Sequence, residues 1–94
     1  MLFRSMEIAF SKSFKKAYKK KITNDISLES RFWESIDIFL IDPFDRRLRT
    51  HKLSGKLKHL WSFSIDFNTR VIFFFTENMR QAVFIDLGTH DEVY

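Results

Sequence analysis

Apolar and polar residues alternate most regularly in the stretch Leu60–Phe67, which reads LWSFSIDF. From Trp61 to Phe67 every odd position is apolar, and every even position between them is serine or aspartate. This period of two is typical of a strand with one face buried and the other in solvent. The pattern therefore predicts a strand whose apolar positions, Phe67 included, face the core.

Two further strands are predicted after this one. Thr69–Thr76 is apolar on both faces apart from Arg70, as expected of a central strand. The polar residues 77–80 predict a turn, and Gln81–Leu87 then runs back beside the central strand until Gly88 ends it. The three segments predict an antiparallel three-stranded meander.

Helical spacing replaces the period of two in the first half of the chain. Ser11 is a good N-cap for the segment 12–23, whose apolar residues fall on one face among lysines. A second helix is predicted from about Ser27 to Ile41, because its apolar residues recur at intervals of four. Asp42 and Pro43 end it, since the residue before a proline is pushed out of the helical region.

A first strand at Leu2–Phe10 completes the predicted order of elements. The 94 residues, 1–94, are expected to form a single α+β domain. Its parts are an N-terminal strand, a two-helix hairpin and the three-stranded meander, joined in one twisted sheet with the helices on one face. Twelve Phe, two Trp and two Tyr supply large apolar areas for the core of so small a chain.

Several classes of protein are disfavoured by composition. The chain has no cysteine, which excludes disulfides, Cys-ligated zinc and thiol nucleophiles. Its longest apolar run, residues 71–75, is far too short to span a bilayer. Arg4 and Glu7 interrupt what would have to be the apolar part of a signal peptide. We expect a soluble, cytoplasmic protein with no membrane partner.

Charge is arranged in blocks along the chain. The net charge is +6 over residues 1–24, −5 over 25–45, +6 over 46–61 and −3 over 62–94. Basic blocks of this kind form surfaces that can meet phosphate. For the lysines of residues 12–21 a solvated helix face is the ordinary interpretation, and a contact with RNA is the alternative.

Arg70 is the unusual residue of the most apolar strand. A guanidinium in such a strand is costly unless it is paired or lies at the strand's mouth. One interpretation is a structural ion pair with Asp66 or Asp86. The other is a phosphate clamp, since the planar fork of arginine matches phosphate oxygens.

The histidines are the other candidates for chemistry, because imidazole titrates near neutrality. For His51, within the basic block, a surface histidine in a loop is the ordinary interpretation and general acid or base work is the alternative, while His90 follows Gly88 and Thr89 at the end of a strand. His59 has a weaker case for function. Tyr94 could cap the edge of the core or stack on a nucleobase.

No metal or cofactor is expected, because the spacing of the three histidines matches no metal site and no Gly-rich phosphate loop is present. A cationic surface, histidines at element ends and an arginine on a strand together suit metal-free cleavage of RNA. One group takes the proton of a 2′-hydroxyl, another protonates the leaving 5′-oxygen, and a guanidinium stabilises the charged phosphorane.

The order of these features resembles the RelE/ParE superfamily of type II toxin–antitoxin toxins, and within it the RelE/StbE group and its YafQ-like branch. The stretches that carry the resemblance are FSKSFKKAYKK, DPFDRRLRTHKLSGKLKHLWSFSID, TRVIFFF and IDLGTHDEVY, which span nearly the whole chain. The resemblance implies a ribosome-dependent endoribonuclease, an mRNA interferase that cuts mRNA in the ribosomal A site. It also implies a cognate antitoxin, with the toxin as a monomer or in a toxin–antitoxin hetero-oligomer.

By position in these motifs, His51 and His90 look like the acid/base pair, with either one as the base. Arg70 looks like the phosphate-stabilising arginine, and Tyr94 matches the terminal aromatic of the site. The implied contacts to the backbone of mRNA or ribosomal RNA come from the basic stretch Arg49, Lys52, Lys56 and Lys58.

The chain departs from the YafQ-like pattern at two positions of the predicted strand. That branch has a histidine and an aspartate where this sequence has Ser64 and Asn68. Neither a hydroxyl nor an amide serves as an acid or base near neutrality. Either His51 and His90 carry both proton transfers, or Asp66 acts as a secondary acid/base.

Three alternatives share these features. A ParE-like inhibitor of DNA gyrase has the same fold and needs no acid/base pair. A non-catalytic basic RNA-binding module needs only the charge blocks. An inactive relative would keep only the surface that binds the antitoxin.

Overall fold

The computed structural model describes residues 6–93. Residues 1–5 and Tyr94 lie outside the described residues, so the first part of the strand predicted at Leu2–Phe10 and the role predicted for Tyr94 fall outside them too. The elements in order are β1 (Glu7–Phe10), α1 (Lys12–Lys21), α2 (Ile26–Ile41), η1 (Arg46–Leu48), β2 (His51–Lys52), η2 (Gly55–Leu57), β3 (Trp61–Ser64), β4 (Thr69–Phe75), β5 (Gln81–Thr89) and α3 (His90–Val93).

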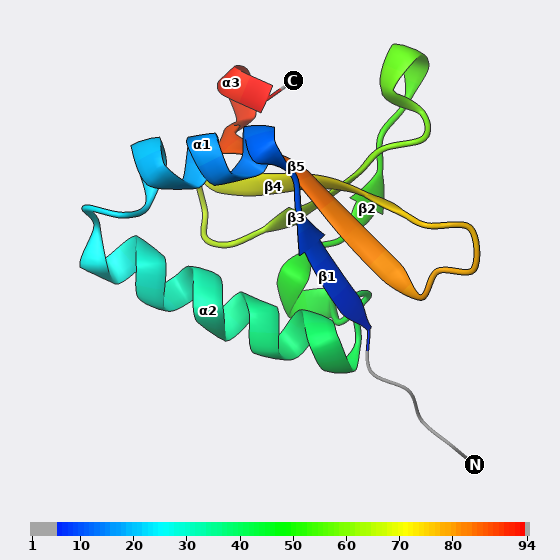
Figure 1. Ribbon diagram of the computed structural model, residues 1–94, viewed down its shortest axis with the longest axis horizontal. Coiled ribbons are helices and arrows are strands. Elements are labelled where there is room, and N and C mark those ends of the chain that lie inside the picture. The colour runs from blue at the N-terminus through cyan, green and yellow to red at the C-terminus, as the bar shows by residue number, and fades with distance from the viewer. Residues whose placement is uncertain (1–5, 94) are drawn as a thin grey trace.

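The strands form one mixed sheet in the order β1-β5-β4-β3-β2, with helices α1 and α2 beside it (Figure 1). β3, β4 and β5 make the predicted antiparallel meander, with β4 in the centre. β1 pairs parallel to β5, and the connection between these two strands contains both helices and the strands β2, β3 and β4. The α+β prediction is therefore confirmed.

Both helices begin where a side chain can accept from their first free amides. The Ser11 hydroxyl accepts from the Phe14 amide at 3.1 Å, as predicted. The carboxylate of Asp25 accepts from the Leu28 amide at 3.0 Å, so α2 starts at Ile26, one residue before the predicted start.

The core is a cluster of phenylalanine rings between the helices and one face of the sheet. Phe39 of α2 lies 5.2 to 5.5 Å, ring centre to ring centre, from Phe63, Phe73 and Phe84 on three strands. Phe14 of α1 contacts the same Phe84 at 5.4 Å. Because both helices meet the same row of rings, they cover the same face of the sheet, as predicted.

His51 is the first residue of the short edge strand β2, where it pairs with Ser62 of β3. Three local predictions were wrong. β3 ends at Ser64, and the chain bends over residues 65–68. Phe67 is consequently 86% exposed instead of buried. β5 does not end before Gly88 but continues to Thr89.

Candidate nucleic-acid interface

The face of the sheet opposite α1 and α2, called the outer face below, carries both polar and apolar side chains, and two of them, Ser62 and Ile72, are buried. Since directly paired residues project from the same face, the register places His51, Ser62, Ile72 and Asp86 in one row across four strands. A second row, two residues further along, consists of Ser64, Arg70 and Gly88. Two of the predicted site residues, His51 and Arg70, thus share the outer face.

Arg70 is held there by a neutral partner. Its guanidinium donates to the hydroxyl of Ser64 at 3.0 Å, across the β3–β4 pair. Within residues 6–93 no carboxylate lies within 4.0 Å of it, so the ion pair with Asp66 or Asp86 that was one interpretation is absent from that part of the chain. Half-buried and without such a partner, this cation is suited to receive an anion.

His51 is exposed at the edge of the sheet, and its Nδ1 lies 3.1 Å from the carbonyl oxygen of Arg49. A carbonyl can only accept, so Nδ1 carries the proton in this contact. In the neutral ring Nε2 is then unprotonated and can take a proton from a substrate. Arg49 adopts a left-handed φ of 53° at the end of η1, a conformation that costs a non-glycine residue about 1–2 kcal/mol.

His90 is the first residue of α3, which folds back over the end of β5. Position 88 pairs with Arg70, so a side chain there would project from the outer face. A Cβ atom added to Gly88 would lie 2.9 Å from Oε1 of Glu92 and 3.2 Å from Cγ1 of Val93. Glycine at this position therefore lets α3 lie against the sheet next to the row that contains Arg70.

Glu92 fixes α3 in this place. One of its carboxylate oxygens accepts from the Thr89 amide at 2.8 Å, while the Thr89 hydroxyl accepts from the Glu92 amide at 3.3 Å. The other oxygen forms an ion pair with the ammonium of Lys21 in α1. The hydrogen bond from Lys21, followed by that from Thr89, lowers the pKa of Glu92 to about 2.

The two histidines lie on opposite sides of Arg70. From the register, three strand spacings and about four residues of strand separate His51 from His90, which corresponds to roughly 15–20 Å between their Cα atoms. Nδ1 of His90 lies 3.7 Å from a carboxylate oxygen of Asp91. The imidazoles therefore do not contact one another, and a substrate that reaches both must cross the Arg70 row.

The remaining predicted site residues lie in three places: a bend, the edge strand β2 and a projecting loop. One carboxylate oxygen of Asp66 accepts from the amides of Asn68 and Thr69, at 2.9 and 2.7 Å, and so braces the bend after β3. Lys52 is on the edge strand, and the exposed Lys56 and Lys58 are on the η2 loop, which extends away from the body of the molecule (Figure 1). His59 follows η2 and is exposed.

A cavity of about 220 Å³ opens beside the Arg70 row. Its lining residues come from η1 and from the end of β3 with the following bend: Arg47, Arg49, Ser64, Ile65, Asp66 and Phe67. Arg47 is paired with Asp45 through two parallel hydrogen bonds of 3.0 Å, and hydrogen bonds from Arg47 lower the pKa of Asp45 to about 2. Arg49 makes no ion pair within residues 6–93.

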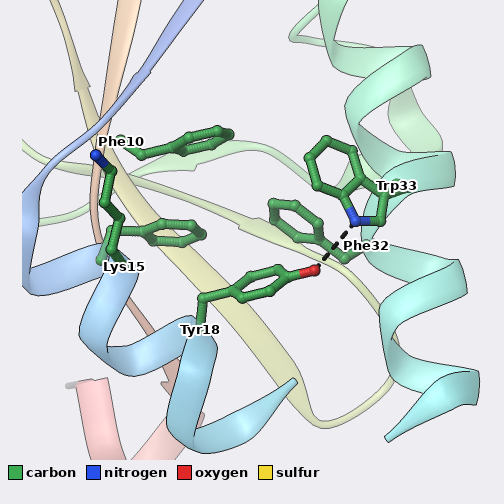
Figure 2. Close-up of a pocket in the computed structure, with 6 residues that line it drawn as sticks. Phe10, Lys15, Tyr18, Phe32 and Trp33 are labelled. Carbon is green, nitrogen blue, oxygen red and sulfur yellow. Dashed lines mark hydrogen bonds between the residues drawn. The ribbon is translucent and has the colours of Figure 1, made fainter. Parts of the chain in front are cut away.

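A second cavity, of about 240 Å³, lies on the helix side and is almost entirely apolar. It is lined by Phe10, Phe14, Lys15, Tyr18, Phe32 and Trp33. Figure 2 shows Tyr18 of α1 and Trp33 of α2 pointing toward one another, with the indole N–H donating to the phenol oxygen at 3.1 Å. The Tyr18 hydroxyl in turn donates to Glu29 at 2.9 Å, so its ring is held in place.

Metal and membrane sites are not evident in the described residues. Residues 6–93 contain no group of three or more His, Asp or Glu side chains placed to hold a metal ion. Among the helices of that segment, none is long and apolar enough to cross a bilayer.

The fold is that of the RelE/ParE toxins, which confirms the predicted resemblance at the level of structure. Similar solved structures include a YoeB/ParE toxin from Agrobacterium tumefaciens, with a TM-score of 0.76 and 18% identity over 90% of this chain and 99% of that one. YafQ from E. coli aligns with a TM-score of 0.68 and 19% identity over 95% and 98% of the two chains. The E. coli DinJ–YafQ toxin–antitoxin complex gives 0.65 and 19% over 99% of both.

Comparison of sequences adds nothing to this, since no family model and no curated protein sequence matches the chain. At identities of 18–19% the structural likeness establishes the fold alone. The site is therefore argued from the geometry of this chain.

Two elements of the site were missed from the sequence. Glu92 and Lys21 are at opposite ends of the chain, and no local pattern predicts that they pair. The capping motif Thr89–Glu92, three residues apart, was a readable signal for α3.

Phe67 was assigned to the core because its alternation continues past the true end of β3, although Asp66 and Asn68 around it are typical bend formers.

Proposed function

We propose that this protein is the toxin of a type II toxin–antitoxin system and that it is a ribosome-dependent endoribonuclease, which cleaves mRNA without a metal. The observation that carries the proposal is Arg70, a half-buried cation on the outer face with a neutral hydroxyl partner, between two exposed histidines. A preorganised guanidinium of this kind stabilises the charge that develops on a phosphate under attack.

In the proposed reaction, Nε2 of His51 takes the proton of the ribose 2′-hydroxyl. The 2′-oxygen attacks the neighbouring phosphorus, and Arg70 stabilises the charge on the pentacoordinate phosphate. The 5′-oxygen leaves with a proton supplied by His90, which yields a 2′,3′-cyclic phosphate and a 5′-hydroxyl end. The hydrogen bond from Nδ1 of His51 to the Arg49 carbonyl supports the choice of His51 as base.

Positively charged side chains around this row supply the contacts to RNA backbone. Arg49 lies at the cavity beside Ser64, and Lys52, Lys56 and Lys58 lie on the edge strand and the η2 loop. A loop that projects from the body can reach phosphates of mRNA or ribosomal RNA that the sheet itself does not touch. The roles of Asp66 as a secondary acid/base and of Tyr94 as a stacking residue stay predictions.

Expression of the protein in bacteria, with mapping of mRNA 5′ ends, tests the proposal. Wild type should arrest growth and produce 5′-hydroxyl ends within translated frames. Arg70→Ala, His51→Ala and His90→Ala should each lower cleavage by at least about 100-fold, the scale of a lost acid, base or charge-stabilising group. Ile26→Ala is the control and should cleave like wild type, because Ile26 is exposed at the start of α2, on the helix side of the sheet.

Inhibition of DNA gyrase, as by a ParE-like toxin, is the second candidate function. The separation of roughly 15–20 Å between His51 and His90 favours it, because a gyrase inhibitor needs no acid/base pair. In the same experiment, DNA breaks with intact mRNA, unaffected by His90→Ala, would establish gyrase inhibition and exclude the nuclease.

An antitoxin partner is part of the proposal, and the helix side of the molecule suits an acidic amphipathic segment of it. α1 exposes lysines along its length, and α2 exposes an apolar stripe at intervals of two turns: Ile26, Trp33 and Ile41, which are 85%, 46% and 69% exposed. Trp33 also borders the apolar cavity, into which an apolar side chain of the partner can insert. Acidic residues of the same segment would face the α1 lysines.

Co-purification with the product of the neighbouring acidic reading frame tests this surface. Trp33→Ala should weaken the complex by at least about tenfold, as expected for a central aromatic anchor. Phe67→Ala is the control, since Phe67 is a more exposed aromatic residue, at 86% against 46% for Trp33, but lies at the bend between β3 and β4. Equal affinities of wild type and Trp33→Ala would place the antitoxin elsewhere.

A further inference from the structure

Phe67 is the most exposed of the large apolar side chains in residues 6–93, at 86%. Its exposure is built into the fold, because β3 ends at Ser64 and the bend that follows is braced by Asp66. The Asp66 carboxylate accepts from the amides of Asn68, in the bend, and Thr69, the first residue of β4. The ring is therefore presented to solvent by an ordered turn next to the strand that carries Arg70.

The surroundings of Phe67 combine an aromatic face with unpaired positive charge. The ring borders the cavity of about 220 Å³ that also contains Arg49. Arg47 also lines the cavity, but its charge is balanced by the ion pair with Asp45. Arg49 has no carboxylate within 4.0 Å in the part of the chain described. A cation and an exposed aromatic ring side by side are the elements with which proteins hold single-stranded nucleic acid.

Ser64 connects this cavity to the proposed catalytic row. Its side chain lines the cavity and accepts from the Arg70 guanidinium at 3.0 Å. A nucleotide in the cavity would thus lie next to the phosphate that Arg70 contacts. The volume is below the roughly 300–1,000 Å³ of pockets for drug-sized ligands, which fits one flat base rather than a longer stretch of chain.

We propose that this cavity is a subsite for one unpaired nucleobase of an RNA strand, adjacent to the phosphate held by Arg70. The base stacks on Phe67, and Arg49 binds the phosphate that follows it. The inference rests on the proposed nuclease function. It gives Phe67 a role in binding the RNA, separate from proton transfer and from stabilisation of the phosphate charge.

Binding of a fluorescein-labelled eight-nucleotide RNA with 2′-O-methyl groups tests the subsite, because this probe lacks the attacking hydroxyl and is not cut. Phe67→Ala should bind the probe about 5- to 150-fold more weakly than wild type, the range for loss of one base–aromatic stack. Phe67→Tyr should bind like wild type, since it keeps the ring. Phe67→Leu should bind like Phe67→Ala, since it keeps the apolar bulk but not the aromatic face.

Ile26→Ala is the matched control, because Ile26 is 85% exposed and apolar but lies at the start of α2. It should bind the probe like wild type. In Phe67→Trp the added indole emission should fall when the probe binds, as expected for an indole under a base. Thermal unfolding of all variants should coincide within a few degrees, since the ring makes no core contact.

Three outcomes would overturn the subsite: full binding by Phe67→Ala, full binding by Phe67→Leu, or no binding of the probe by wild type. Loss of antitoxin affinity in Phe67→Ala with unchanged RNA binding would likewise overturn it and assign the ring to a protein contact. Failure of the nuclease proposal is separate. A wild type that binds the probe through Phe67 but leaves mRNA intact in cells would refute cleavage and keep the subsite.

Discussion

Lys21 in the last turn of α1 and Glu92 in α3 form an ion pair that joins segments 71 positions apart in the sequence. Because the same carboxylate caps the Thr89 amide, the pair holds the residue that precedes His90. The orientation of a proposed catalytic histidine therefore depends on a lysine that belongs to the opposite end of the chain.

The first prediction concerns pH. Glu92 has a folded-state pKa of about 2, below its ordinary value of 4.5, so it favours the folded α3 most above pH 4.5. This contribution should disappear progressively as the pH falls from about 4.5 to about 2. The amide resonance of Thr89 and the side-chain carboxyl resonance of Glu92, followed by NMR, should titrate together in that window.

Lys21→Met is the control for this titration. Without the ammonium the pKa of Glu92 should return toward its ordinary value, and both resonances should shift at higher pH. Asp45, whose pKa is also about 2 because of Arg47, should titrate unchanged in the same variant. A Glu92 that titrates near pH 4.5 in wild type would show that the ion pair does not persist in solution.

The second prediction concerns Gly88. In Gly88→Ala the new methyl group would meet Cβ of Glu92 at 3.1 Å and Cγ1 of Val93 at 3.2 Å, so α3 must shift. We expect a loss of about 1–3 kcal/mol in the free energy of unfolding, typical of overpacking, together with reduced cleavage. Chemical denaturation and the growth-arrest assay measure the two effects.

Gly55→Ala provides the comparison. Gly55 has a positive φ of 67° but no atom within 4 Å of an added Cβ, so its substitution strains the backbone by about 1–2 kcal/mol without crowding a neighbour. It should leave the Thr89 and Glu92 resonances of α3 unchanged. If Gly88→Ala arrests growth as fully as wild type, the packing of α3 against the sheet has no part in function.

The third prediction concerns Ser64. In Ser64→Ala the Arg70 guanidinium loses its hydrogen-bond partner while its charge remains. Cleavage should fall by about 12- to 150-fold, which corresponds to the 1.5–3 kcal/mol of a hydrogen bond to a charged group, and Ser64→Thr should keep most of the wild-type rate. An unchanged rate in Ser64→Ala would mean that Arg70 is positioned by other contacts or is not in the reaction.

The fourth prediction concerns the core. Phe84 is fully buried and its ring contacts Phe10, Phe14, Phe39, Phe63 and Phe73. Phe84→Ala should cost about 3–5 kcal/mol of unfolding free energy. Ile26→Ala, at an exposed site, should change it by less than about 0.5 kcal/mol. Similar midpoints in urea for the two variants would contradict the packing described.

The order of elements was predictable from the sequence because the hydrophobic pattern and the helix caps are local signals. Ser11 and Pro43 mark helix limits through backbone chemistry that needs no tertiary contact. The short strand β2 was not predictable, since two residues carry no period and His51 is in a strand only because Ser62 lies opposite. The prediction for Phe67 was wrong for a related reason, because an alternating sequence pattern does not show where the pairing between two strands stops.

For the site, the sequence predicted which residue types stand out but not their partners. The choice between an ion pair and an anion site at Arg70 depended on cross-strand register, which places Ser64 rather than a carboxylate opposite. The separation of His51 and His90 also follows from strand order. Both are properties of the assembled sheet.

The parallel pairing of β1 with β5 has a consequence for the timing of folding. β1 leaves the ribosome well before β5, which is its one strand neighbour in residues 6–93. The sheet cannot close its first edge, and Arg70 cannot gain Gly88 opposite it, until β5 has emerged. The row that pairs Arg70 with Gly88 is therefore completed only after β5 has been synthesised, whatever the order in which the helices and the other strands fold.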